Sequence, residues 1–147
     1  MNECDRLSNM KDFTLTIYMI SRNTHSYYAR KLKKLGITMG QFPFVMKIAE
    51  NDGISQEKLS GKLAISKSNT ALIIKQLLDL KLIEREVDAN DRRNFKLHIT
   101  ERGKSLLPEI RKVIDQCHEN LLSTLSSAEK KTLLSMLEKV FENSELI

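Results

Sequence analysis

The sequence Leu82-Ile83-Glu84-Arg85-Glu86-Val87-Asp88-Ala89-Asn90-Asp91-Arg92-Arg93-Asn94-Phe95-Lys96-Leu97-His98-Ile99 decides the fold that we predict for this chain. Two short strand-like runs, 82–87 and 94–99, flank a charged tip at 88–93. Apolar and polar residues alternate along the second run, which is the period-two pattern of a half-buried strand. The stretch therefore predicts a β-ribbon with two adjacent arginines at its tip.

Two capped helical segments precede this ribbon. Ser55 is placed to cap a short helix over 56–63, and Ser66 is placed to cap a longer apolar helix that runs to Leu80. Because the link between them, Ala64-Ile65, is so short, the two helices must cross at a steep angle, as in a helix-turn-helix. Helix, helix, strand, charged tip and strand is the order of a winged helix-turn-helix, which places its second helix in the major groove of DNA.

Longer helical patterns lie on both sides of this unit. We predict helices over about 7–35, over 39–51 with Thr38 as the cap, from Thr100 to about 125, and from a capping box at Ser126 to about 143. The expected fold class is mainly α with a small β-wing (α+β). Its architecture is a winged helix-turn-helix with long N- and C-terminal dimerisation helices.

The flanking helices carry more apolar surface than one winged helix can cover. We expect residues 36–104 to form the DNA-binding lobe, residues 1–35 an N-terminal dimerisation helix, and residues 105–147 the C-terminal dimerisation helices. Two-fold homodimers are the commonest way to cover such surfaces. A dimer of this kind would present two recognition helices to a palindromic operator in double-stranded DNA.

Composition agrees with this interpretation. The 147 residues are 41% hydrophobic and 29% charged, and no run approaches the ~20 apolar residues of a membrane span. The polar start of the chain lacks the apolar core of a secretory signal, so we expect a cytoplasmic protein with no membrane partner. Of the formal net charge of +5, residues 54–104 carry +4, from eleven Lys or Arg and seven Asp or Glu. A localised basic excess is the electrostatic footprint of nucleic-acid binding.

The helix over 66–80 has one apolar and one polar side on a helical wheel. The residues expected to pack into the domain are Thr70, Ile73, Ile74 and Leu77. The candidate DNA-binding residues are Ser66, Lys67, Ser68, Asn69, Leu72, Lys75 and Gln76. Free N–H groups at the helix start attract phosphate, whereas Asn and Gln side chains favour adenine and Lys suits a phosphate or guanine. Leu72 either touches a thymine methyl group or is an ordinary exposed leucine.

The paired arginines of the ribbon tip are the remaining DNA-binding candidates. Arg92 and Arg93 suit phosphates or the minor groove. The plainer interpretation is a pair of surface ion pairs with Asp88 or Asp91. Both can hold at once, because one arginine tied to Asp91 would stiffen the tip while the other enters the groove.

No motif predicts an enzyme, a metal or a cofactor. Gly103-Lys104-Ser105 lacks the glycine that a phosphate-binding loop needs at position 98, where this chain has a histidine. The histidines His25, His98 and His118 are scattered, which is unlike a zinc site. Cys4 and Cys117 form no disulfide framework and are expected to be free thiols. We therefore expect no catalytic residue, no metal ligand and no cofactor.

Several motifs resemble those of the MarR-type (multiple antibiotic resistance) transcriptional regulators. They are Gly36-Ile37-Thr38 with Gln41-Phe42, Ser55-Gln56-Glu57-Lys58-Leu59, Ile65-Ser66-Lys67-Ser68, Leu82-Ile83-Glu84-Arg85, the tip 88–93, and Ile99-Thr100-Glu101-Arg102-Gly103. They cover roughly residues 36–104, and the flanking helices match in length and order. The pattern Asp-x-x-Asp-x-Arg followed by a strand and Thr-x-x-Gly is the most specific of them.

The resemblance implies a homodimer that binds a palindromic operator, represses nearby genes and releases DNA when a small phenolic or other lipophilic effector binds. It also implies that Asp91 and Arg93 are the paired acid and base of the wing, with Asp91 stabilising it. Two departures matter. Ala71-Leu72 stands where the family often has Thr-Arg, which removes a cation from the recognition helix, and Lys81 stands where it often has Gly, which suggests a different helix exit.

The expected effector site is the crevice between the dimerising helices and the DNA-binding lobe. Its candidate residues are Tyr18, Arg22, His25, Tyr28 and Phe42. The polar members could hold a carboxylate or phenol, and the alternative is that they are core-edge and surface residues.

Two alternative functions stay open. One is a winged helix that binds another protein, which an uncharged recognition face would favour. The other is a redox-responsive regulator acting through Cys4 and Cys117. Thr16 occupies the place where some relatives carry a peroxide-sensing cysteine.

Overall fold

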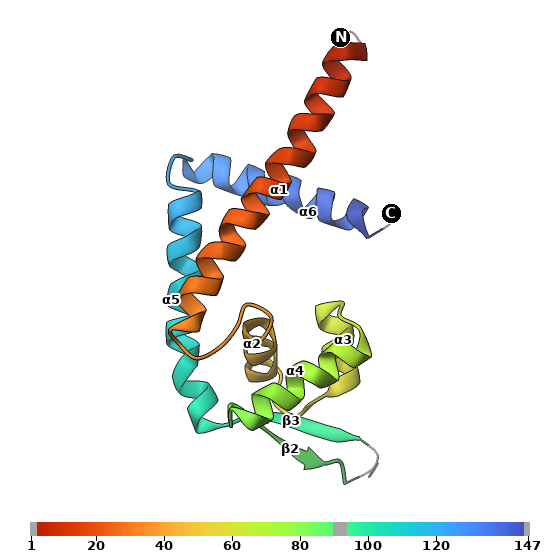
Figure 1. Ribbon diagram of the computed structural model, residues 1–147, viewed down its shortest axis with the longest axis vertical. Helices are drawn as coiled ribbons and strands as arrows, with labels where there is room; N and C mark the ends of the chain where they lie inside the picture. The colour runs from red at the N-terminus through yellow and green to blue at the C-terminus, as the bar shows by residue number, and fades with distance from the viewer. Residues whose placement is uncertain (1–2, 90–93, 146–147) are drawn as a thin grey trace. The chain divides into compact units, whose positions relative to one another are not determined.

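A computed structural model describes residues 3–89 and 94–145, with side chains from Asp12 onward. It divides into two compact units, residues 1–113 and 114–147. The first holds α1 (Glu3–Lys33), α2 (Phe42–Glu50), β1 (Ile54–Ser55), α3 (Gln56–Leu63), α4 (Lys67–Asp79), β2 (Ile83–Val87) and β3 (Phe95–Ile99). Helix α5 (Glu101–Leu121) begins in the first unit and ends in the second, and α6 (Ser127–Ser144) lies in the second (Figure 1). The predicted fold class, mainly α with a small β-wing, is confirmed.

The core of the first unit lies where the winged helix meets the end of α1. Its fully buried side chains come from almost every element: Leu32, Phe44, Val45, Ile48, Leu59, Thr70, Leu77, Leu82, Leu97 and Ile110. The four residues predicted to face inward from α4 are all buried. The recognition helix is thus fixed by its apolar side, which leaves the opposite side outward.

Helix α2 begins at Phe42, three residues later than the predicted start at Met39. The reason is Pro43, which has no N–H to donate and is tolerated only in the first turn of a helix. Residues 39–41 form a turn instead, in which the Thr38 carbonyl accepts the N–H groups of Gln41 and Phe42.

Three helices end in the same left-handed turn. The residues with positive φ at these ends are Gly36 (76°), Ala64 (51°) and Lys81 (57°). After Lys81 the pattern is a Schellman motif, because Leu82 N–H donates to the Leu77 carbonyl and Lys81 N–H to that of Leu78. The turn that ends α4 therefore requires the left-handed backbone conformation that glycine adopts most easily. Lys81 adopts this conformation in spite of its side chain. The expectation of a different exit at this position was wrong.

The sheet has three antiparallel strands in the order β1-β3-β2. In the ribbon Ile83 pairs with Ile99 and Val87 with Phe95, which confirms the predicted hairpin. The sequence pattern missed β1, whose two residues pair with Leu97 and Lys96. A two-residue strand is too short to show a periodic pattern.

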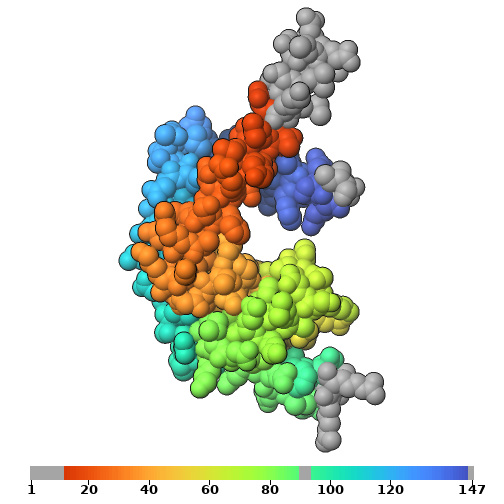
Figure 2. Space-filling view, in the orientation of Figure 1, coloured from red at the N-terminus to blue at the C-terminus, as the bar shows by residue number. Residues whose placement is uncertain are grey.

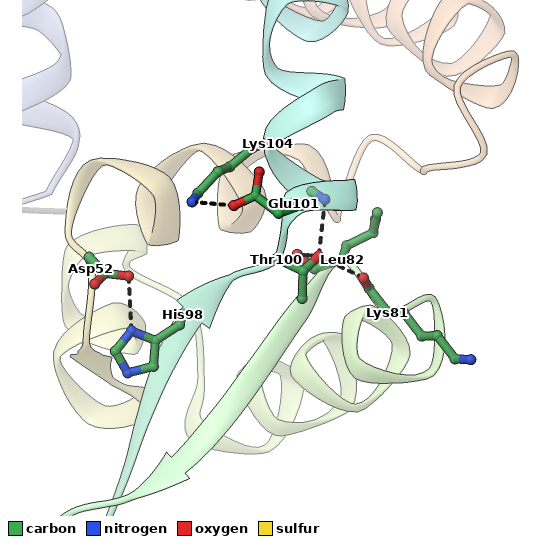
Figure 3. A network of polar contacts seen from close by, with 8 residues as sticks. Asp52, Lys81, Leu82, His98, Thr100, Glu101 and Lys104 are labelled. Carbon is green, nitrogen blue, oxygen red and sulfur yellow. Dashed lines mark hydrogen bonds and ion pairs between the residues drawn. The ribbon is translucent and has the colours of Figure 1, made fainter.

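The start of α5 is hydrogen-bonded to the turn between α4 and β2 (Figure 3). Thr100 Oγ1 accepts the Gly103 N–H (3.1 Å), which confirms Thr100 as the helix cap. The same hydroxyl donates to the Lys81 carbonyl at 2.7 Å. Thr100 thereby joins the exit of the recognition helix, the ribbon and α5 at one side chain.

The second unit holds the end of α5 and all of α6. Ser126 and Glu129 form the capping box predicted for the last helix. Exposed apolar side chains of α6 include Leu134, Met136, Leu137, Val140 and Phe141. None of the described helices is long and apolar enough to cross a membrane.

Candidate nucleic-acid interface

The recognition helix α4 presents a mixed polar face to solvent. Ser68, Leu72 and Gln76 are exposed and follow each other at four-residue steps, so they form one row along the helix. Lys75 is exposed beside this row, and Leu72 is 54% exposed. Figure 2 shows the surfaces of α3 and α4 (yellow-green to green) adjoining on one face of the winged helix. The polar side predicted for this helix is therefore confirmed.

The N-terminus of α4 is capped by a serine and carries an exposed cation. Ser66 Oγ accepts the Asn69 N–H, which confirms the predicted cap. Lys67 Nζ lies 3.0 Å from Glu57 Oε1 of α3, and both side chains are more than three-quarters exposed. Exposed pairs of this kind contribute little to stability and break easily, so Lys67 stays available to a phosphate.

The row on α4 is anchored by a contact that we did not predict. Gln41, which is 6% exposed, donates from Nε2 to Gln76 Oε1 at 3.0 Å. Gln41 Oε1 accepts the Thr38 N–H at 2.9 Å. The spacing Thr38-x-x-Gln41 is that of a capping box, and this signal in the sequence could have identified Gln41 as a fixed side chain.

The wing carries a cation on its strand β2. The guanidinium of Arg85 on β2 lies 4.8 Å from the centre of the Phe95 ring on β3, which is a cation–π contact. On β3, Lys96 Nζ lies 3.8 Å from Asp88 Oδ1. The predicted tip residues Asp91, Arg92 and Arg93 lie outside the described residues.

His98 ties the ribbon to the turn before β1 (Figure 3). Its Nδ1 lies 2.9 Å from Asp52 Oδ1. Its Nε2 lies 3.5 Å from Glu86 Oε2. Lys104 of α5 lies 2.7 Å from Glu101, and this hydrogen bond raises the pKa of the Lys104 amine. Of these contacts, the one between His98 and Asp52 fixes the wing relative to the turn that follows α2, whereas the pair of Lys104 and Glu101 lies within α5.

The candidate effector residues are only partly brought together. The rings of Tyr28 and Phe42 stack with centres 5.8 Å apart, and Tyr27 meets Tyr28 edge to face at the same distance. Tyr18 is 58% exposed, and Arg22 and His25 are exposed as well. No ring contact joins Tyr18 to this stack within the part of the chain that the structure describes.

Cys117 is a buried free thiol, whereas the side chain of Cys4 lies outside those described. Among residues 12–89 and 94–145, no three His, Cys, Asp or Glu side chains are arranged to hold a metal ion.

A helix-turn-helix with an exposed polar recognition face, followed by a two-stranded wing, defines a winged helix-turn-helix protein of the DNA-binding class. The family model described as the MarR family matches residues 37–95. YybA from Bacillus subtilis (strain 168), named as an uncharacterized HTH-type transcriptional regulator, is 34% identical over 136 residues, which are 92% of this chain and 91% of that protein.

Solved structures of MarR-family regulators are also similar to this chain. A MarR transcriptional regulator from Methanosarcina mazei Go1 has 34% identity and a TM-score of 0.83, covering 93% of this chain and 99% of that one. A protein from Listeria monocytogenes solved with a 26mer DNA has 33% identity and a TM-score of 0.81, covering 88% and 87%. This chain belongs to the MarR family of transcriptional regulators, and it is not an enzyme.

Proposed function

We propose that this regulator is a cytoplasmic homodimeric repressor that binds a palindromic operator and leaves it when a small lipophilic or phenolic effector binds. Residues 36–104 form the DNA-binding lobe, and residues 1–35 and 105–147 supply the dimer interface. The observation that carries the proposal is the division of α4 into a buried apolar side and an exposed side with Ser68, Lys75 and Gln76.

DNA contact follows from the chemistry of this exposed side. The cap at Ser66 leaves backbone N–H groups for a phosphate, and Lys67 and Lys75 add cations. Ser68, Asn69 and Gln76 supply hydrogen-bonding groups for base edges, and Leu72 supplies an apolar contact for a thymine methyl group. Arg92 and Arg93 of the wing, stabilised by Asp91, contact the flanking phosphates or minor groove.

Dimerisation follows from the apolar side chains left uncovered in the flanking helices. Five large apolar residues of α6 are at least 43% exposed, and α1 exposes Phe13, Leu15 and Ile20 in the same way. A monomer would leave this surface in water, and a second copy of the chain is the simplest partner that removes it.

The effector part of the proposal rests on the stack of Tyr28 on Phe42. An aromatic ligand packs well against such a stack, and Arg22 and His25 on α1 would hold its carboxylate or phenol oxygen. Binding there would change the separation of the two recognition helices, which weakens both half-site contacts together.

The test is footprinting on the DNA upstream of the chain's own gene, with the mass of the free and DNA-bound protein measured in parallel. We expect one dimer to protect two half-sites one helical turn apart, or a multiple of that distance. Adding salicylate, as a probe with a phenol and a carboxylate, should reduce the protection. A monomer at micromolar concentration, or protection of a single half-site, would contradict the dimer.

A further inference from the structure

The contact between Gln41 and Gln76 fixes which atoms of the Gln76 amide face outward. A backbone N–H can only donate, so the atom of Gln41 that lies 2.9 Å from the Thr38 nitrogen must be the carbonyl oxygen. The other end of the Gln41 amide, its NH2 group, therefore faces Gln76. Because an NH2 group can only donate, the atom of Gln76 that receives it, 3.0 Å away, must be Oε1.

The Thr38 N–H therefore fixes the orientation of the Gln41 amide, and the Gln41 amide fixes that of the Gln76 amide on the surface of α4. If Gln41 turned over, its NH2 group would face the Thr38 N–H, donor against donor, and its side chain is only 6% exposed. A buried donor without a partner is costly, which holds Gln41 in place. The Gln76 NH2 group has no partner among the described residues and belongs to an exposed side chain.

A glutamine that is free to turn reads adenine by accepting from N6 and donating to N7. With its oxygen engaged by Gln41, Gln76 offers chiefly donors. In the major groove, guanine presents two acceptors, O6 and N7, and thymine presents O4, whereas cytosine presents only a donor. The adenine preference that the residue type suggests is therefore not the one that this arrangement favours.

We propose that Gln41 is a positioning residue that orients Gln76 as a hydrogen-bond donor, so that Gln76 selects guanine or thymine at one position of each half-site. This inference rests on the proposed function, because it requires α4 to lie in the major groove. Gln41 itself need not touch DNA.

The test is selection of binding sites from a random DNA pool at pH 8, with base ratios at each position read for the wild type and for Gln41→Glu. The carboxylate of Gln41→Glu still accepts the Thr38 N–H, as in an ordinary capping box, so the fold should be kept. It can no longer donate, so the Gln76 amide turns over and presents its oxygen outward. Selection should change at one position per half-site, from guanine or thymine to adenine or cytosine, by about tenfold.

Gln116→Glu on α5 is the matched control, because it makes the same charge change at an exposed position outside the winged helix. The mass of this variant is compared with that of the wild type, because residues 105–147 are proposed to supply the dimer interface. The control should leave every base ratio as in the wild type. If Gln41→Glu does not fold, as judged by its thermal unfolding, Gln76→Glu replaces it. That surface variant accepts from Gln41 and presents a second acceptor outward, so it should make the same change of base.

The possible outcomes distinguish a failure of the proposed function from a failure of the inference about Gln41 and Gln76. Wild-type protein that selects no sequence would overturn the proposed function and this inference with it. Wild-type protein that selects a palindrome, together with a folded Gln41→Glu or Gln76→Glu that selects the same bases, would overturn the inference alone. Uniformly weaker binding without a change of base would also overturn it, because it would place Gln76 on a phosphate.

Discussion

Gly103 lies so close to Leu82 that a Cβ atom at position 103 would collide with the Leu82 carbonyl oxygen and approach Ile99 Cγ1 to 2.6 Å. The first turn of α5 therefore packs directly on the backbone of the ribbon. Two contacts explain the Thr-x-x-Gly spacing. Thr100 caps the helix, and Gly103 lets the helix pack closely on the Leu82 backbone just before β2.

Gly103→Ala should lower the free energy of unfolding by about 3 kcal/mol, since a backbone carbonyl cannot move aside as a flexible side chain would. Chemical denaturation monitored by circular dichroism measures the loss. Gly61→Ala is the control, because a Cβ there meets nothing within 4 Å. It should stabilise α3 by up to about 1 kcal/mol. Equal effects of the two substitutions would contradict the close approach.

Lys81→Gly should stabilise the protein by roughly 1 kcal/mol, because it relieves the left-handed conformation of a residue that carries a Cβ. Lys62→Gly, which removes the same charge inside helix α3, should instead cost about 1 kcal/mol. Thermal unfolding of both variants checks the opposite signs. Destabilisation by Lys81→Gly would mean that the lysine side chain contributes more than its strained backbone costs.

Leu72→Arg should make DNA binding tighter and more dependent on salt, because it places a cation in the middle of the exposed row on α4. One added phosphate contact steepens the slope of log K against log salt by about 1. Fluorescence anisotropy over a salt series measures the slope. Gln116→Arg adds the same charge outside the winged helix, and its mass is measured as well because residues 105–147 are proposed to supply the dimer interface. As a dimer it should leave the slope unchanged, so a similar change in both variants would remove Leu72 from the DNA interface.

Stability at acid pH should depend on the cap of α6. The Ser126 backbone N–H and hydroxyl both donate to Glu129, which lowers the pKa of that carboxyl below its ordinary value of 4.5. A group with a lowered pKa in the folded state stabilises above its unfolded pKa, and this contribution is lost as pH falls through the folded pKa. The difference in stability between the wild type and Glu129→Gln should therefore be constant above about pH 5.5 and shrink below pH 4.5.

Glu138→Gln, at an exposed position of the same helix, serves as the control. The difference in stability between Glu138→Gln and the wild type should not shrink in this way as the pH falls below 4.5. A Glu129→Gln difference that stays constant down to pH 3 would show that the capping box does not carry this dependence.

Most of the winged helix could be predicted because its signals are local. Ser55, Ser66 and Ser126 are followed by capped helices, and the alternation at 95–99 fixes a strand. The buried side of α4 also follows from helical periodicity. The contact of Gln41 with Gln76 could not be predicted in this way, because it joins residues 35 positions apart and depends on how the turn before α2 lies against α4.

The start of α2 and the exit of α4 show the limits of residue preferences. Thr38 is a good cap by type, but Pro43 moves the start of the helix to Phe42. Lysine disfavours a positive φ, yet the Schellman bonds and the Thr100 hydroxyl hold Lys81 there. In both places several hydrogen bonds act together against one local preference.

The most direct test of the central claim, that α4 and the wing read DNA, is binding to the DNA upstream of the chain's own gene across a salt series, with random DNA as the reference. We predict a specific complex at least about 1,000-fold tighter than that with random DNA, and a steep fall of affinity with salt as several phosphate contacts are lost. No DNA affinity even at low salt would contradict the account, and would favour a winged helix that binds another protein.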